Sequence, residues 1–321
     1  MAEKLLEVKD LHVEYITDDG PVYAVNGIDF SVSKRETLGL VGETGAGKTT
    51  TALSILKLLP EKVGSIKQGS ILLDGTDIIH TAEKDMRTIR GNVASMIFQD
   101  PMTSLNPTFT VGEQIAEVVA LHKTDFTKEQ VNARVDEMMR LVGLPQERKS
   151  EFPHQFSGGM KQRVVIAMAL ACDPKIILAD EPTTALDVTI QAQVLKMMRN
   201  LKEQFDTAMI LITHDLGVVA ETCDNVAIMY AGEIIEIGTV EDIFEADKHH
   251  PYTTGLFGSI PDMTKEERRL HPIDGLMPDP TCKIEGCAFC ERCPQRMEIC
   301  ETVKPTAFAD GTHSIKCHLF K

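Results

Sequence analysis

The sequence from residue 42 to residue 49 is Gly42-Glu43-Thr44-Gly45-Ala46-Gly47-Lys48-Thr49, which matches the pattern G-x-x-x-x-G-K-[ST]. A short apolar run, 37–41, precedes it, and a segment with helical spacing, 49–59, follows it up to Pro60. The pattern therefore lies between a strand and a helix, where a phosphate-binding loop has to lie. Its glycines allow successive backbone N–H groups to curl around a phosphate, and the start of the helix adds its positive end.

This loop predicts a site for ATP and Mg²⁺. The ammonium group of Lys48 would bind the β- and γ-phosphates, and the hydroxyl of Thr49 would be a ligand of Mg²⁺. We expect the following loop residues to contact the nucleotide: Gly42, Glu43, Thr44, Gly45, Ala46, Gly47, Lys48, Thr49 and Thr50.

A pair of carboxylates forms the second part of the predicted site. Asp180 and Glu181 follow the apolar segment 176–179, as acidic residues at the end of a buried strand would. We expect Asp180 to hold Mg²⁺ through water and Glu181 to orient and polarise the attacking water. Phosphoryl transfer depends mostly on positioning and electrostatics, so these carboxylates and Lys48 cover much of what hydrolysis needs.

The pattern of the remaining sequence predicts an α/β fold. Apolar and polar residues alternate over about the first 35 positions, as in half-exposed antiparallel strands. A further strand pair is predicted over 69–73 and 93–98, and the segment 99–170 is mostly helical, with Thr127 and Gln130 in a capping box. Strands then alternate with helices, which implies a parallel sheet covered on both faces. The predicted elements of this part are strands at 176–179, 208–212, 226–230 and 233–237 and a helix at 190–201.

Composition restricts the function and the compartment. The formal net charge is −15, which argues against a protein that grips nucleic acid, because phosphate binding needs a basic face. The N-terminus lacks the apolar stretch of a signal peptide, and the longest apolar run, 164–172, is about half the ~20 residues that cross a bilayer. We therefore expect a cytosolic chain whose membrane role depends on partners.

A second glycine motif carries a family resemblance. The sequence Phe156-Ser157-Gly158-Gly159-Met160 precedes the apolar helix 164–170, with Ser157 placed as its N-cap. This arrangement resembles the signature motif of ABC ATPases, in which a helix N-terminus again faces a phosphate. Gln99 looks like the Q-loop glutamine of that family, the segment 185–187 looks like its D-loop, and His214 looks like its switch histidine.

The resemblance to ABC ATPases implies a P-loop NTPase fold with three parts. The first is a RecA-like mixed sheet with an antiparallel N-terminal subdomain, formed by 1–98 and 171–240. The second is a helical subdomain with the signature motif, 99–170, and the third is a small Cys-rich C-terminal extension, 241–321. The boundary near 240 agrees with a change to a proline-punctuated, cysteine-rich composition.

The same resemblance assigns further residues to the nucleotide. It implies that Gln99, Glu181 and His214 are catalytic, that Gln99 also reaches Mg²⁺, and that His214 contacts the γ-phosphate. Tyr15 would stack on adenine, although the insertion 18–21 makes Tyr23 an alternative. A second nucleotide, bound mainly by a partner subunit, would be contacted by Ser157, Gly158, Gly159 and Asp187.

Finer features resemble the peptide-importer branch of the family. The sequence His250-Pro251-Tyr252-Thr253 looks like the start of the C-terminal extension in oligopeptide, dipeptide and nickel importer ATPases, and the segment 153–160 favours the "D" type of ATPase. This resemblance implies ATP hydrolysis that drives uptake of di- or oligopeptides, from the cytoplasmic face of the cell membrane. The implied partners are a second, non-identical ABC ATPase, two transmembrane permeases and, indirectly, an extracytoplasmic peptide-binding protein. Two alternatives are a nickel or other small-solute cargo and a soluble ABC ATPase that acts on DNA or ribosomes.

Six of the eight cysteines crowd into the segment 282–317. In a reducing compartment such a group indicates metal ligation before disulfides. The importer family carries Cys-x5-Cys-Pro-x5-Cys and a later Cys-His, and it holds a [4Fe–4S] cluster there. A structural Zn²⁺ site is the alternative to this cluster. Cys290 and Cys282 depart from the cysteine spacing of the family. The segment lies far along the chain from every nucleotide motif, so we expect it to act separately from ATP binding. The cluster ligands that the resemblance implies are Cys287, Cys293, Cys300 and Cys317.

Overall fold

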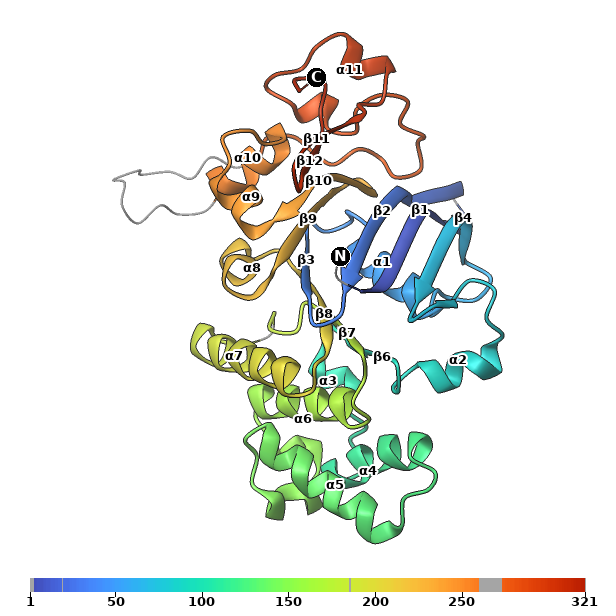
Figure 1. Ribbon diagram of the computed structural model, residues 1–321, viewed down its shortest axis with the longest axis vertical. Helices are drawn as coiled ribbons and strands as arrows, with labels where there is room; N and C mark the ends of the chain where they lie inside the picture. The colour runs from blue at the N-terminus through green and yellow to red at the C-terminus, as the bar shows by residue number, and fades with distance from the viewer. Residues whose placement is uncertain (1–2, 19, 185, 260–272, 321) are drawn as a thin grey trace.

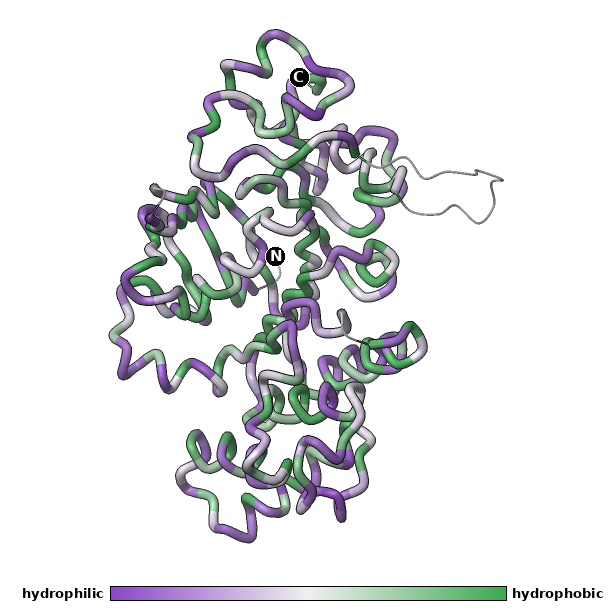
Figure 2. The backbone as a smooth tube through the Cα atoms, turned by 180° about the vertical axis from the view of Figure 1, so that it is seen from behind, coloured by the Kyte–Doolittle hydropathy of each residue, from purple (hydrophilic) through white to green (hydrophobic). Residues whose placement is uncertain are grey.

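The computed structural model describes residues 3–18, 20–184, 186–259 and 273–320. A central sheet lies in the middle of an elongated molecule, with a group of helices at one end and the C-terminal segment at the other (Figure 1). Hydrophobic positions gather along the strands that run through the middle of the molecule (Figure 2). No helix in the described ranges is long and apolar enough to cross a membrane.

The N-terminal part is an antiparallel sheet with the strand order β2-β1-β4-β5. In β1 (Lys4–Thr17), buried Leu6, Val8 and Val13 alternate with more exposed residues, which confirms the predicted pattern. The strand pairs on one side with β2 (Gly20–Ser33) and on the other with β4 (Gly64–Leu73), and β5 (Thr76–Asp77) completes the sheet.

The central sheet has the strand order β11-β12-β10-β9-β3-β8-β7-β6 in the described residues. Neighbouring strands are parallel from β9 to β6, as the alternation of strands and helices predicted. The strands β3 and β7 are buried at every position, which explains their continuous apolar sequences. The bounds of the five parallel strands are β9 Asn225–Tyr230, β3 Thr37–Val41, β8 Ala208–Thr213, β7 Ile176–Asp180 and β6 Ala94–Ile97.

Two sequence predictions in this region were wrong. The segments 69–73 and 93–98 do not pair, because the first belongs to β4 in the antiparallel sheet and the second to β6, at the edge of the central sheet. The first helix, α1 (Lys48–Ile55), also ends before Pro60. Lys57, just after it, has a left-handed backbone with a φ of +52°. The chain therefore turns away before the proline.

Helices α3 to α6 form the helical end of the molecule (Figure 1). Thr127 caps α5 in a capping box with Gln130, as predicted, and Thr110 does the same for α4 with Glu113. Buried residues such as Val135, Met138 and Ile166 form one core between these helices and the β6–β7–β8 side of the sheet. The bounds of the helices here and around the sheet are α2 Glu83–Ile89, α3 Pro101–Ser104, α4 Val111–His122, α5 Lys128–Leu141, η1 Gln146–Ser150, η2 Pro153–Gln155, α6 Gly158–Leu170, α7 Val188–Gln204 and α8 Leu216–Thr222.

The C-terminal segment continues the central sheet. Strand β10 (Glu233–Thr239) follows β9 through a turn at Ala231 and Gly232, both of which have positive φ angles. Strand β12 (His313–Lys316) pairs with β10 and with β11 (Ala307–Asp310), so the end of the chain adds two strands to the sheet. The helical elements of this segment are α9 Val240–Glu245, α10 Pro251–Gly258, η3 Cys290–Arg292 and α11 Ile299–Thr302.

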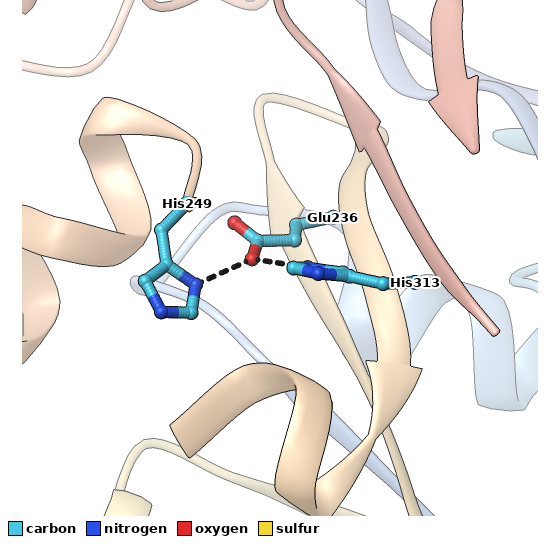
Figure 3. Close-up of side chains that lie close together, drawn as sticks. All are labelled: Glu236, His249 and His313. Atoms are coloured by element: carbon cyan, nitrogen blue, oxygen red, sulfur yellow. Dashed lines mark hydrogen bonds and ion pairs between the residues drawn. The ribbon is translucent and has the colours of Figure 1, made fainter. Parts of the chain in front are cut away.

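A buried carboxylate, that of Glu236, fastens this segment to the sheet (Figure 3). One of its oxygens accepts hydrogen bonds from His249 Nδ1 and His313 Nε2, both at 2.8 Å. The other oxygen accepts from the backbone N–H of His250 at 2.8 Å and from the Thr253 hydroxyl at 2.6 Å. These four donors lie on β12 and around the start of α10. The side chain of Glu236 on β10 therefore holds both of these elements.

The charges in this cluster stabilise one another. Burial alone would raise the pKa of Glu236, but the hydrogen bonds from His249, Thr253, His250 and His313 outweigh burial and lower it. The hydrogen bond to Glu236 raises the pKa of His249, against the opposing effect of burial. The carboxylate is therefore ionised at neutral pH and is saturated with donors.

Replacing Glu236 by Ala should loosen the C-terminal segment, because four donors would lose their common acceptor. Leaving buried partners unpaired costs about 3 kcal/mol or more. The cost should appear as a lower urea midpoint and as faster proteolysis within 240–320. Glu245→Ala, an exposed change on α9, is the matched control. Equal midpoints for the two variants would contradict this role of Glu236.

Candidate active site

The parallel strands bring the predicted nucleotide residues to one edge of the sheet. The loop 42–47 follows β3, His214 follows β8, Asp180 ends β7 and Gln99 follows β6 closely. Because β3, β8, β7 and β6 are consecutive neighbours in the sheet and run parallel, their carboxyl ends lie side by side. Residues more than one hundred positions apart thereby reach one site.

The backbone of the loop needs its glycines. Gly45 and Gly47 have φ angles of +87° and +99°, in the left-handed region that favours glycine. A Cβ atom at Gly47 would also lie 2.4 Å from the carbonyl oxygen of Ala24, too close for any side chain. Helix α1 begins directly after Gly47, so its free N–H groups and positive end face the loop.

Lys48 lies folded back onto the loop and is 6% exposed. Its ammonium group donates hydrogen bonds to the carbonyl oxygens of Gly42 and Glu43, at 2.6 and 3.0 Å. Burial lowers the pKa of Lys48, and the charges of Glu181, Asp180 and Glu43 oppose this effect. The loop thus holds a positive charge within its own curve, close to both strand-end carboxylates.

Thr49 and Asp180, two of the three predicted Mg²⁺ ligands, are in direct contact, whereas Gln99, the third, bonds to Glu181. The Thr49 hydroxyl donates a hydrogen bond of 2.8 Å to a carboxylate oxygen of Asp180. Burial raises the pKa of Asp180, and the hydrogen bond from Thr49 partly offsets this rise. A hydroxyl and a carboxylate next to a phosphate loop are oxygen ligands of the kind that Mg²⁺ prefers, so this pair fits the predicted ion.

Glu181 gathers the other predicted catalytic side chains. Its carboxylate accepts a hydrogen bond from Gln99 Nε2 at 3.0 Å and lies 3.3 Å from Nδ1 of His214. Thr184, which the sequence analysis did not single out, donates another at 2.8 Å. Burial would raise the pKa of Glu181, but the hydrogen bonds from Thr184 and His214 outweigh it and lower the pKa. Glu181 therefore carries an ionised carboxylate at neutral pH.

The backbone of Glu181 is also unusual. Its φ is +45°, a left-handed conformation that a non-glycine residue adopts at some cost. A hydrogen bond from its N–H to the carbonyl oxygen of Ile212 on β8 stabilises this turn.

Together with the loop, the site offers a phosphate cradle, an oxygen pair for a cation and a fixed ionised carboxylate. This set is suited to the transfer of a phosphoryl group to water.

The signature residues face solvent at the start of α6. Ser157 caps the helix by accepting a hydrogen bond from the N–H of Met160, as predicted, and both Ser157 and Gly158 are exposed. A Cβ atom at Gly159 would lie 2.6 Å from Ile190 of α7. Asp187 caps α7 by accepting from the N–H of Ile190 at 3.0 Å. Ala185, the first residue of the predicted D-loop, lies outside the described residues.

The two candidate adenine-stacking tyrosines lie in different surroundings. The hydroxyl of Tyr15 lies 3.2 Å from that of Thr50 on α1, beside the loop. The backbone N–H of Tyr23 bonds to the carbonyl oxygen of Pro280, and its ring lies 5.6 Å from the ammonium of Lys283. Tyr23 thus packs against the C-terminal segment, and it also lines a cavity with Thr44 and Gly45 of the loop.

Five of the six clustered cysteines line one cavity. They are Cys287, Cys290, Cys293, Cys300 and Cys317. Cys282 is exposed and lines a different cavity, beside β1 and β2. Burial and the neighbouring thiols Cys300, Cys317 and Cys293 raise the pKa of Cys287 to about 12. The four predicted ligands are therefore close together, as ligands of one metal centre have to be.

A second group of possible metal ligands lies outside this cavity. Among the described residues, Glu236, His249 and His313 place their ligand atoms within 4.8 Å of one another.

The cysteine segment, which lies far from the nucleotide motifs in the sequence, contacts the nucleotide loop in the fold. Arg292, between Cys290 and Cys293, forms an ion pair with the carboxylate of Glu43, at 2.9 and 3.2 Å. These residues are 249 positions apart in the sequence. No periodicity or motif links them, so sequence reasoning had no signal for this contact.

Comparisons with known proteins agree on one family. The family model described as "ABC transporter" matches residues 25–184, and the model described as "Oligopeptide/dipeptide transporter, C-terminal region" matches residues 235–300. The chain is 50% identical to the dipeptide transport ATP-binding protein DppD of Bacillus subtilis, over 99% of this chain and 95% of the relative. It is also 50% identical to the oligopeptide transport ATP-binding protein OppD of the same organism, over 98% and 89%.

Solved structures share the fold of the larger part of the chain. One is cbiO1 from Clostridium perfringens, part of an ABC transporter complex, with a TM-score of 0.65 and 27% identity over 75% of this chain and 91% of that chain. Another is a dimeric bacterial ABC transporter cassette, with a TM-score of 0.66 and 25% identity over 73% and 98%.

Two substitutions should separate binding from hydrolysis at this site. Glu181→Gln should retain ATP but lower turnover by a factor of order 10² or more, because it removes the charge that orients the attacking water. Lys48→Ala should weaken nucleotide binding itself, because the loop loses its cation. Equilibrium binding and phosphate release, measured on both variants, test the two roles. Near-normal turnover by Glu181→Gln would contradict the assignment.

Proposed function

The chain belongs to the ATP-binding subunits of oligopeptide and dipeptide ABC transporters, and we propose from this membership that its site hydrolyses ATP to drive peptide uptake. The observation that carries the proposal is the contact of Thr49 with Asp180 beside the loop that holds Lys48. This arrangement joins a phosphate cradle to an oxygen pair for a cation. Relatives named for dipeptide and oligopeptide transport match the chain over almost its whole length.

Each polar residue of the site has a role in this reaction. Lys48 and the N–H groups of the loop would bind the phosphates, and Thr49 and Asp180 would hold Mg²⁺, which would neutralise developing charge. Glu181 orients the attacking water, with Gln99 and Thr184 fixing its carboxylate. His214, on the other side of the carboxylate, contacts the γ-phosphate. The ring of Tyr15 stacks on adenine.

The site is shared with a second ATPase subunit. The N-terminus of α6, with Ser157 and Gly158, is exposed and offers free N–H groups for a phosphate. A chain with a phosphate loop and an exposed second phosphate-binding helix end suits an arrangement in which each subunit completes the other's site. One of the similar solved cassettes is dimeric. The partner is a non-identical ATPase.

The membrane partners are two permease subunits, which receive peptides from an extracytoplasmic binding protein. Phe98, Met102 and Phe109, which lie next to Gln99 or within ten residues of it in the sequence, are large apolar side chains that lie exposed. Such a group of exposed apolar residues is typical of a docking surface. Docked there, a permease would sense the position of Gln99, and the chain would be peripheral on the cytoplasmic face of the membrane.

The isolated chain should be a poor ATPase, because it supplies only part of each site. Adding the second ATPase and the permeases should raise turnover per chain by a factor of order ten or more. Steady-state phosphate release by the dilute chain and by the assembled complex, at equal chain concentration, tests this. A dilute monomer that hydrolyses ATP as fast as the complex would rule out a shared site.

The cysteine cavity holds a [4Fe–4S] cluster with a structural role. The support is the common cavity of Cys287, Cys293, Cys300 and Cys317. The segment that carries them has few regular elements, and small cores of this kind commonly need a metal staple. Cys290 also lines the cavity, so it is the remaining rival ligand.

The chain purified without oxygen should contain about four irons and four sulfides and should be brown. Cys293→Ser should lower the iron content, whereas Cys282→Ser should not, because Cys282 lies outside the cavity. Cys290→Ser tests the rival ligand: it should leave the iron content unchanged if the predicted four cysteines hold the cluster. Iron, sulfide and zinc analysis of these proteins is the measurement. One zinc per chain and no iron would leave the zinc alternative standing.

A further inference from the structure

Arg292 is a buried arginine whose donors are fully used. Its Nη1 and Nη2 atoms donate to the two carboxylate oxygens of Glu43, at 2.9 and 3.2 Å, in a bidentate pair. The same two nitrogens donate to the hydroxyl of Tyr230 and the carbonyl oxygen of Ile273, and Nε donates to the carbonyl oxygen of Asp274. The side chain is 6% exposed. All five N–H groups of the guanidinium thus have acceptors, which fixes its position.

A second contact holds the same loop residue. The backbone N–H of Glu43 donates a hydrogen bond of 3.0 Å to the hydroxyl of Tyr252. The ring of Tyr252 is fully buried against Tyr230 and Phe289, with ring centroids 4.7 and 5.5 Å away. The C-terminal segment therefore holds Glu43 at its side chain and at its backbone.

Glu43 is also the residue on which Lys48 rests. Its carbonyl oxygen accepts a hydrogen bond from the Lys48 ammonium, 3.0 Å away. The N–H, the carbonyl and the carboxylate of Glu43 are thus all engaged, two by the C-terminal segment and one by the nucleotide-binding lysine. A shift of Arg292 or Tyr252 would move the part of the loop that shapes the phosphate cradle.

The position of Arg292 connects this contact to the cysteines. It ends η3 (Cys290–Arg292), and Cys293 follows it directly. Cys287 and Phe289 belong to the apolar cluster that also contains Tyr230 and Tyr252. A group bound by the cysteines would fix the backbone of η3. It would thereby also fix the position of the Arg292 guanidinium, which pairs with Glu43 of the loop.

We propose that Arg292 and Tyr252 are positioning residues that hold the phosphate loop ready for nucleotide, so that the state of the cysteine centre sets the affinity for MgATP. This inference rests on the proposed binding of ATP at the loop. It makes the C-terminal segment part of the nucleotide site through the two contacts with Glu43. By linkage, nucleotide binding in turn stabilises the segment around the cysteines.

The test is the affinity of the purified full chain for the magnesium complex of a non-hydrolysable ATP analogue, AMP-PNP, measured by calorimetry without oxygen. Arg292→Ala should bind roughly tenfold more weakly, because it removes a charged, bidentate contact with the loop. Arg292→Lys should recover part of the loss, since lysine restores the charge but not the fork. Arg296→Ala is the matched control, because Arg296 lies in the same segment and, among the described residues, forms its ion pair with Glu301 of that segment.

Three further variants keep the test decisive if Arg292→Ala loses its metal or unfolds locally. Glu43→Gln removes the charge from the loop side and leaves the C-terminal segment unchanged, and it should weaken binding to a similar extent. The double variant Arg292→Ala, Glu43→Gln should bind the analogue no more weakly than whichever single variant has the lower affinity. The reason is that both substitutions remove the same interaction, that of Arg292 with Glu43. Cys293→Ser should also weaken binding.

The outcomes separate this inference from the proposed function. Unchanged affinity in Arg292→Ala and in Glu43→Gln, with metal content retained, would overturn the inference and leave ATP binding intact. A native chain that fails to bind the analogue would contradict the proposed function instead. Weakening in Arg296→Ala equal to that in Arg292→Ala would also overturn the inference, because it would show a general effect of the segment's charge.

Discussion

The hydrogen bond between Thr49 and Asp180 is the contact on which the site depends. It joins the first turn of α1 to the end of β7, although 131 positions separate the two residues. It can form only because β3, which leads into the loop, and β7 are parallel and flank β8 in the sheet. The register of these buried strands therefore fixes the distance between Thr49 and Asp180, and the apolar residues of the strands maintain that register.

Sequence patterns predicted the elements of this site well, because local chemistry specifies them. The glycines of the loop and the apolar run before Asp180 both report local conformation, and so does the serine cap at Ser157. Each was found where it was expected. The convergence of Gln99, Glu181 and His214 could also be anticipated, although through resemblance to a family and not through periodicity. The left-handed backbone of Glu181 could not, since no residue type at that position signals it.

The predictions that failed concern partners in space. The strands at 69–73 and 93–98 were recognised, but alternation does not tell a strand which sheet it joins. The contact of Arg292 with Glu43 and the donors around Glu236 are similar cases. Each of these contacts forms between residues that are distant in sequence. In the sequence alone, Arg292, Glu43 and Glu236 cannot be told from ordinary surface charges. Burial turns them into anchors, and only the folded arrangement shows it.

The hairpin of β11 and β12 has a consequence for the molecule as a whole. Without it, β10 would be the border of the central sheet, with a row of free N–H and C=O groups open to any other extended chain. Pairing at Glu236–Ile315 and Ile237–Ser314 occupies part of that row. The hairpin thus moves the border of the sheet from β10, which has seven residues, to β11, which has four, and a shorter border strand offers fewer unpaired groups to another chain. A chain that ended near residue 240 would keep the phosphate loop and the strand-end carboxylates and would expose the whole length of β10.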